Sequence, residues 1–347
     1  MVNTYKCPGC GAPIEFDGVQ GEMVCDYCGK HVNVSEMNTE TDSYECDVED
    51  ATEDKSEYGS FDSYKCSNCG AEILTDEHTS ATMCSYCGSP ALIKNRLNGE
   101  LMPAAVIPFR LNKAMAKEKF ASWTRKGMLT PSCFKKEATV NSIEGIYVPF
   151  WLYDYDAHVD MTADATRVKR ERKGDMEYTH TSHYKILREI EASYDKIPAD
   201  ASARMPDDVM DKLEPFDYND MTKFEMPYLS GYCSEKYNFT KEEMNYRAER
   251  RANSYAFKEC RDTIKGYSSI KITNSRTRLR RNRAMYTLFP VWMLNYKYKN
   301  KDYFFAVNGQ TGKIVGKLPL SKKKMALWFF GIFAGMEGIM LLFGGLL

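Results

Sequence analysis

Cys7-Pro8-Gly9-Cys10-Gly11 and Cys25-Asp26-Tyr27-Cys28-Gly29 are two copies of a Cys-x-x-Cys-Gly motif within the first thirty residues. Two such motifs together supply four thiolates, the usual ligand set of a structural zinc site. The glycine after each motif lets the backbone turn tightly and direct amide groups at the thiolates. The pattern therefore predicts a rubredoxin-like zinc ribbon over residues 1–35.

The same pattern occurs a second time, and each cysteine recurs 59 residues further along the chain, as Cys7 does at Cys66. Tyr27 also recurs, as Tyr86. This internal duplication predicts a second ribbon over residues 64–96 and two closed structural Zn²⁺ sites with no open position for water or substrate. Redox dithiols and an iron–sulfur cluster stay open as alternatives. The two predicted ligand sets are Cys7, Cys10, Cys25 and Cys28, and Cys66, Cys69, Cys84 and Cys87.

No apolar run precedes Cys7, so we expect no secretory signal and a reducing, cytosolic environment, in which cysteines bind metal more often than they form disulfides. Four further cysteines are scattered singly and receive no role: Cys46, Cys133, Cys233 and Cys260. The formal net charge of −1 argues against a whole-protein polyanion binder. Residues 36–63 contain eleven acidic side chains and one lysine, which predicts a disordered acidic linker between the ribbons.

Residues 97–320 combine helical and strand-like patterns, which predicts a mixed antiparallel α+β domain. A short amphipathic helix is expected over Asn112–Lys126, ending at Gly127, and a longer one begins at Thr240, which forms a capping box with Glu243. Aromatic and β-branched residues predict strands over Ile146–Val159, Tyr178–Ile190, Ser268–Arg278 and Tyr286–Ala306.

Two further sequence features concern this domain. Val148-Pro149-Phe150-Trp151 resembles Phe289-Pro290-Val291-Trp292, which predicts two related strand modules. Residues 303–315 predict a hairpin in which the Asn308-Gly309 and Thr311-Gly312 steps supply positive φ angles. Gly312-Lys313 does not form a phosphate loop, because the serine or threonine that must follow the lysine is absent.

Little in the domain suggests catalysis. His158 lies between Asp156 and Asp160, and His180 and His183 would point to opposite faces of a strand, so we interpret these histidines as surface residues. Residues 276–283 are rich in arginine, and the sequence leaves open whether they meet lipid, nucleic acid or solvent. Because no catalytic constellation can be identified, we expect a protein that is not an enzyme.

The last residues are strongly apolar. Residues 325–347 contain one charge, Glu337, and follow three lysines, so residues 321–347 are interpreted as a basic flank and a transmembrane helix. The lysines place residues 1–324 in the cytoplasm, which predicts a single-pass protein of the cell membrane. Gly331 and Gly335 form a Gly-x-x-x-Gly step that permits contact with a partner helix.

These features together resemble a known family. The tandem ribbons, the two Pro-containing strand motifs, the Val307–Lys313 hairpin and the apolar tail are similar to bacterial transcription-factor-IIB-type zinc-ribbon membrane proteins. The resemblance covers nearly the whole chain. It implies the zinc-ribbon component of a Gram-positive membrane-stress module, whose partners are SPFH-domain (flotillin-like) and phage-shock-protein-A-like (PspA-like) proteins.

The sequence and the resemblance favour an adaptor function over nucleic-acid binding. The expected function is a non-enzymatic, membrane-anchored adaptor whose cytosolic zinc ribbons dock partner proteins at the membrane during envelope stress. The alternative is a membrane-tethered nucleic-acid-binding protein that uses the ribbons and the arginine-rich strand. The identity of the docking partner, the oligomeric state and the stimulus stay undetermined by the sequence.

Overall fold

The computed structural model describes residues 2–3, 5–38, 61–65, 72–76, 79–83, 90–93, 102–131, 143–203, 205–299 and 301–344. The chain divides into two compact units. Unit 1 comprises Met1–Val148, Arg204–Lys236 and Leu288–Leu347, and unit 2 comprises Pro149–Ala203 and Tyr237–Thr287. Two long strands, β10 (Glu144–Lys173) and β14 (Ser269–Tyr298), contribute residues to both units.

The N-terminal residues of unit 1 form a small three-stranded antiparallel sheet. Its strands are β2 (Glu15–Asp17), β3 (Glu22–Val24) and β4 (His31–Val32), and a 3₁₀ helix, η1 (Val34–Asn38), follows them. Ile14, Phe16 and Met23 are buried and make a small apolar core beside the cysteine motifs. We call residues 5–38 ribbon 1.

Only part of the second predicted ribbon is described. Its strands are β5 (Phe61–Lys65), which pairs with β6 (Glu72–Asp76), and β7 (Thr79–Met83), which pairs with β8 (Pro90–Ile93). The N-terminal strand β1 (Val2–Asn3) pairs with β8. Residues 39–60 of the predicted acidic linker lie outside the described residues, whereas η1 and β5 include its two ends.

An aromatic cluster centred on Phe109 forms the core of unit 1. The ring of Phe109 stacks on Tyr232 with centroids 4.1 Å apart and meets the rings of Tyr147 and Trp292 edge-on. Unit 1 also contains helices α1 (Lys113–Lys126) and α3 (Asp207–Leu213), the 3₁₀ helices η5 (Tyr218–Asp220) and η6 (Met226–Leu229), and strands β9 (Ala105–Val106), β12 (Thr222–Lys223), β13 (Cys233–Glu235), β15 (Lys301–Asn308) and β16 (Ile314–Gly316). Gly127 ends α1 as predicted, whereas Asn112, which was expected within the helix, is its N-cap.

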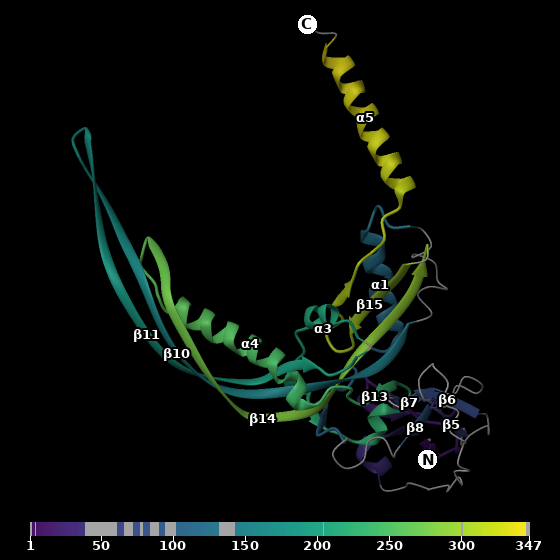
Figure 1. Ribbon diagram of the computed structural model, residues 1–347. Helices are drawn as coiled ribbons and strands as arrows, with labels where there is room; N and C mark the ends of the chain where they lie inside the picture. The colour runs from purple at the N-terminus through teal and green to yellow at the C-terminus, as the bar shows by residue number, and fades with distance from the viewer. Residues whose placement is uncertain are drawn as a thin grey trace. The chain divides into compact units, whose positions relative to one another are not determined.

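Unit 2 is a sheet with one covering helix. Strand β10 forms a long antiparallel hairpin with β11 (Met176–Asp200) and also neighbours β14, and α4 (Lys241–Asp262) lies along these strands (Figure 1). Along β10, alternate residues from Ala157 to Ala165 are buried, so one face of the strand packs on α4. The helix presents a stripe of small residues at four-residue intervals, which permits close approach: Ala248, Ala252, Ala256 and Cys260. The capping box of Thr240 and Glu243 is confirmed.

The two related Pro-containing strand motifs make equivalent contacts, one in each unit. The carbonyl of Pro149 accepts a hydrogen bond from the amide of Ala201 at 2.9 Å, and that of Pro290 accepts one from Gly309 at 2.9 Å. The indole of Trp151 donates to the carbonyl of Phe239, also at 2.9 Å. In the same way, the indole of Trp292 donates to the carbonyl of Leu111. The sequence similarity therefore corresponds to a shared hydrogen-bonding pattern.

The predicted hairpin forms between β15 and β16, but only one of its two glycines has the expected conformation. Gly312 has a φ of 76°, whereas Gly309 is not among the positive-φ residues of the described chain. A Cβ at Gly309 would lie 2.6 Å from the ring of Phe109, so close packing explains this glycine. The prediction of a positive φ was therefore wrong for Gly309.

The predicted fold class needs correction in two respects. First, strands dominate the described chain, because β10 and β14 each have 30 residues and β11 has 25, where the sequence predicted shorter strands in a mixed antiparallel α+β domain. The outer part of the β10–β11 hairpin is exposed and polar, so hydrophobic periodicity could not mark it. Backbone pairing continues there without a buried face.

Second, the predicted transmembrane helix is not supported. Helix α5 (Lys322–Gly344) forms, but it begins at the first of the three lysines, which lie inside the helix and not before it. Among the residues that the structure describes, no helix combines the length and the apolar character needed to span a membrane. The prediction of a single-pass cell-membrane protein is corrected by this finding. Contact of a partner helix at Gly331 and Gly335 stays a prediction, and no described atom lies within 4 Å of an added Cβ at either residue.

Candidate metal centre

The first predicted ligand set comes together in ribbon 1. The four Sγ atoms of Cys7, Cys10, Cys25 and Cys28 all lie within 4.8 Å of one another. The Sγ atoms of Cys7 and Cys28 are 3.6 Å apart, and those of Cys10 and Cys25 are 3.5 Å apart. Metal–sulfur bonds of about 2.3 Å in a tetrahedron require sulfur separations of about 3.8 Å. The four cysteines can therefore hold a metal ion with only small adjustments.

The backbone around each motif explains this convergence. The amides of Gly11 and Gly29 donate to the carbonyls of Cys7 and Cys25, both at 2.8 Å, which closes a tight turn at each motif. The two glycines have φ angles of 77° and 69°, a region that side-chain-bearing residues avoid. The amide of Gly9 also points at the Cys7 sulfur, 3.4 Å away. The role predicted for the glycines, tight turns that direct amide groups at the thiolates, is confirmed for ribbon 1.

The electrostatics of the site favour negative charge on the Cys7 sulfur and oppose it on the Cys28 sulfur. Burial raises the pKa of Cys7, but amide hydrogen bonds from Gly9 and Cys10, together with neighbouring thiols, outweigh it and lower that pKa to about 6. The Lys30 amide lowers the pKa of Cys28, but the sulfurs of Cys10 and Cys7 raise it more, to about 12. One thiolate thus suppresses ionisation of its neighbour, and a divalent cation is the partner that allows all four to be deprotonated.

Ribbon 1 is attached to the rest of unit 1 through its first strand, β2. The amide of Phe16 donates to the carbonyl of Ser230 at 3.0 Å, and the hydroxyl of Ser230 donates back to the carbonyl of Ile14 at 2.7 Å. The ring of Phe16 packs edge-on against Tyr228, with centroids 5.0 Å apart. Gly18 sits so close to Phe109 that an added Cβ would lie 1.9 Å from its carbonyl oxygen. These contacts therefore fix the position of the cysteine motifs relative to the rest of unit 1.

The chain has a relative of almost the same length. Uncharacterized protein YdjG of Bacillus subtilis (strain 168) is 40% identical over 349 residues, which cover 99% of this chain and 99% of that protein. The chain belongs to the YdjG family. No family model matches it, and no solved structure matches it. Membership of the YdjG family thus establishes the relationship, and the chemistry has to be argued from the residues of this chain.

In this YdjG-family chain the metal centre has one buried and one exposed side. Cys7 and Cys25 are buried, whereas Cys10 and Cys28 are exposed. Between the last two cysteines of the set, Tyr27 is 82% exposed. An exposed aromatic side chain between two candidate metal ligands was not anticipated from the sequence. Its recurrence as Tyr86 in the second motif was the available signal.

The second predicted ligand set, Cys66, Cys69, Cys84 and Cys87, lies outside the described residues, as do Cys46 and Cys133. Of the remaining single cysteines, Cys260 is buried in the core of unit 2, and burial raises the pKa of Cys233 to about 11. Neither thiol has the lowered pKa of a reactive cysteine, which agrees with assigning them no role.

Proposed function

We propose that this chain is a non-enzymatic adaptor in which Zn²⁺ holds ribbon 1 in shape and the exposed loop of the ribbon docks a partner protein. The partners implied by the resemblance, SPFH-domain and PspA-like proteins, are the proposed ligands. The same role is proposed for the second cysteine set, which would form a second Zn²⁺ site. The observation that carries the proposal is Tyr27, an 82% exposed aromatic side chain on a loop anchored by two metal ligands.

The chemistry of the ligand set supports a docking role. Four thiolates complete a tetrahedral shell, so zinc bound there has no open position at which to activate water or polarise a substrate. A metal-closed loop is rigid before binding, and a rigid aromatic side chain loses little conformational entropy in a complex. Exposed tyrosines of this kind are common energetic centres of protein interfaces.

The alternative function, nucleic-acid binding, is less well supported by the arginine-rich strand. Arg278 donates to Asp160 at 2.9 Å, and Arg280 donates to Asp156 at 2.7 Å. Two of the arginines that the sequence offered for phosphate binding thus have carboxylate partners on β10. Binding a phosphate would require breaking these pairs, which favours the docking proposal.

Crosslinking and affinity purification of the full-length protein, followed by mass spectrometry, test the proposal. The informative variant is Tyr27→Ala, together with a double variant that also carries Tyr86→Ala. Removing a central interface tyrosine costs about 2 kcal/mol, so we expect recovery of SPFH-domain or PspA-like proteins to fall about 30-fold. Metal content should be unchanged, because the tyrosine is not a ligand.

The matched control is Tyr246→Ala, which removes another exposed tyrosine, 58% exposed on α4 of unit 2. It should leave partner recovery as in the wild-type protein. Undiminished recovery by the double tyrosine variant would refute the docking surface. Failure of the wild-type protein to recover either partner class would refute the proposed partners.

A further inference from the structure

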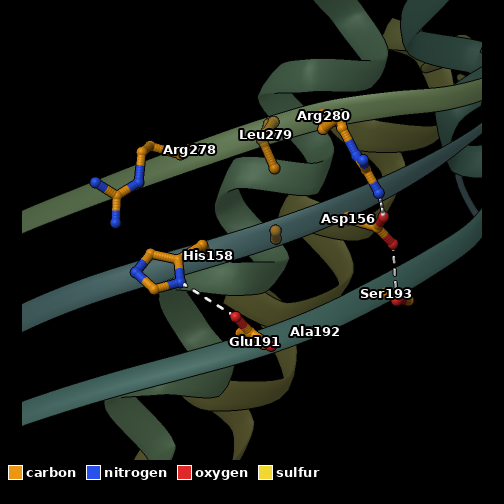
Figure 2. Close-up of a pocket in the computed structure, with 9 residues that line it drawn as sticks. Asp156, His158, Glu191, Ala192, Ser193, Arg278, Leu279 and Arg280 are labelled. Atoms are coloured by element: carbon orange, nitrogen blue, oxygen red, sulfur yellow. Dashed lines mark hydrogen bonds and ion pairs between the residues drawn. The ribbon is translucent and has the colours of Figure 1, made fainter.

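A second group of metal-ligating side chains lies in unit 2, on the face of the sheet away from α4. The register of the β10–β11 hairpin places His158 opposite Glu191 and Asp160 opposite Glu189. Because residues two apart on a strand share a face, all four side chains point to the same side. Figure 2 shows the imidazole of His158 on β10 directed toward Glu191 of β11, with Arg278 of β14 on the other flank.

Three of these side chains converge at one point. The Nε2 atom of His158 lies 3.3 Å from Oδ1 of Asp160 and 3.3 Å from Oε1 of Glu189. Metal bonds to imidazole nitrogen and carboxylate oxygen are about 2.0–2.2 Å, which in a tetrahedron separates the ligand atoms by about 3.4 Å. The three atoms lie within 4.8 Å of one another and already have nearly the spacing that a shared cation requires.

Outer groups orient two of the three ligands. The other imidazole nitrogen of His158, Nδ1, faces Oε1 of Glu191 at 3.7 Å. A carboxylate on this side of a metal-binding histidine favours the tautomer that carries its proton on Nδ1 and leaves Nε2 free to coordinate. The second oxygen of Asp160, Oδ2, accepts a hydrogen bond from Arg278 at 2.9 Å, which leaves Oδ1 directed at the histidine. Ligand orientation by such partners is the usual construction of metal sites.

The charge of the cluster favours a cation, and the cavity beside it leaves space for water bound to that cation. Three carboxylates surround one imidazole, and one of them is paired with Arg278, so with a neutral histidine the cluster carries net negative charge. His158 and Glu191 line a cavity of about 580 Å³. Such a cavity has room for water or a small anion beside a three-ligand ion.

We propose that unit 2 binds a divalent transition-metal ion through Nε2 of His158, Oδ1 of Asp160 and Oε1 of Glu189, with Glu191 and Arg278 as positioning residues. The ligand set is nitrogen and oxygen, in contrast to the four sulfurs of ribbon 1. Imidazole and carboxylate ligands suit Mn²⁺ and Zn²⁺, and three protein ligands leave coordination positions open, unlike the closed sulfur site. The site is independent of the proposed docking function, which concerns unit 1.

The competing interpretation is that a protonated imidazole pairs with the three carboxylates and no metal binds. Electron paramagnetic resonance with Mn²⁺ separates the two, because the signal of free Mn²⁺ disappears on binding. The experiment uses the full-length, zinc-loaded protein, in which the soft thiolate sites retain zinc and leave oxygen-rich sites to Mn²⁺. We expect one Mn²⁺ bound per chain.

Four variants locate the ion. His158→Gln and Glu189→Gln should abolish stoichiometric Mn²⁺ binding, and Glu189 is exposed enough for its replacement to leave folding intact. Glu191→Gln should weaken binding by about 10-fold to 100-fold, the usual effect of losing a group that orients a ligand. His180→Gln, on the same hairpin but outside the cluster, is the matched control and should bind as the wild-type protein does.

Absence of Mn²⁺ binding to the wild-type protein would overturn the proposal, as would equal binding by the wild-type protein and the Glu189 variant. Circular dichroism of each variant confirms that the fold is retained. None of these outcomes depends on partner capture by ribbon 1, so the two proposals can fail separately.

Discussion

Replacing Gly29 by alanine is expected to loosen ribbon 1 by an amount that follows from the structure. Gly29 has a φ of 69°, and no atom lies within 4 Å of an added Cβ. The substitution therefore causes no collision, and its whole cost is the left-handed backbone, about 1–2 kcal/mol for a residue with a side chain. Reduced freedom of the unfolded chain offsets about 0.4–1 kcal/mol of this cost.

The net destabilisation is about 1 kcal/mol, which corresponds to an equilibrium constant about fivefold less favourable. Amide hydrogen exchange reports this quantity locally. The amide of Gly29 is bonded to the carbonyl of Cys25 at 2.8 Å and exchanges only when the turn opens. In the zinc-loaded protein we expect the Gly29→Ala variant to exchange about fivefold faster in the peptide that contains residues 22–32, since the rate follows the opening equilibrium.

Gly9→Ala is the matched control, because Gly9 lies in the same ribbon but is not among the positive-φ residues. Its added Cβ would lie 3.2 Å from Cδ of the flexible Lys30 side chain and in ordinary van der Waals contact with the Sγ atoms of Cys7 and Cys28, at 3.7 and 3.8 Å. Exchange in this variant should stay near the wild-type rate. Equal acceleration in the two variants, or none in Gly29→Ala, would refute the argument that left-handed backbone shapes the metal loop.

Three further outcomes are expected. Gly18→Ala should destabilise unit 1 by about 1–3 kcal/mol, because the new Cβ would collide with the backbone of Phe109. Urea denaturation measures this loss of stability, and metal analysis should show that the zinc content is unchanged. Hydrogen bonds from Arg280, Asn282 and Ser193 lower the pKa of Asp156 to about 2 from an ordinary 3.8. The stability that this carboxylate contributes is thus present above its ordinary pKa and is lost as the pH falls through about 2, so the difference in melting temperature between the wild-type protein and Asp156→Asn should shrink over that range. Chelation of zinc should accelerate exchange throughout ribbon 1 while helix α4 keeps its protection, which hydrogen-exchange mass spectrometry can resolve.

The local features of this protein could be predicted from the sequence, because they depend on residues that are close together along the chain. The spacing of Cys7, Cys10, Cys25 and Cys28 correctly predicted one cluster, since two short motifs with adjacent glycines determine where four sulfurs can point. The start of α4 at Thr240 was equally clear, because a capping box involves only residues three apart.

Properties that depend on contacts between distant segments could not be predicted from the sequence. The sequence offered Gly309 as a turn residue, but packing against Phe109 decides its role. The membrane prediction was overturned because no helix of the described residues is long and apolar enough to span a membrane, and helix α5 includes the three lysines that were expected to precede it. The exposure of Tyr27 likewise depends on which side of ribbon 1 packs against the rest of unit 1.

The cluster around His158 shows the same division most clearly. The sequence placed His158 and Asp160 two residues apart, which fixes that they share a face of a strand. Glu189 joins them because the hairpin turns at Gly174, whose φ is 63°, and the register runs unbroken from this turn to the Tyr155–Tyr194 pair. A shift of one residue would have moved Glu189 to the opposite face. The amino-acid sequence thus determined the ligand types, the caps and the alternation, whereas strand register and packing, which are set by long-range contacts, decided which side chains meet.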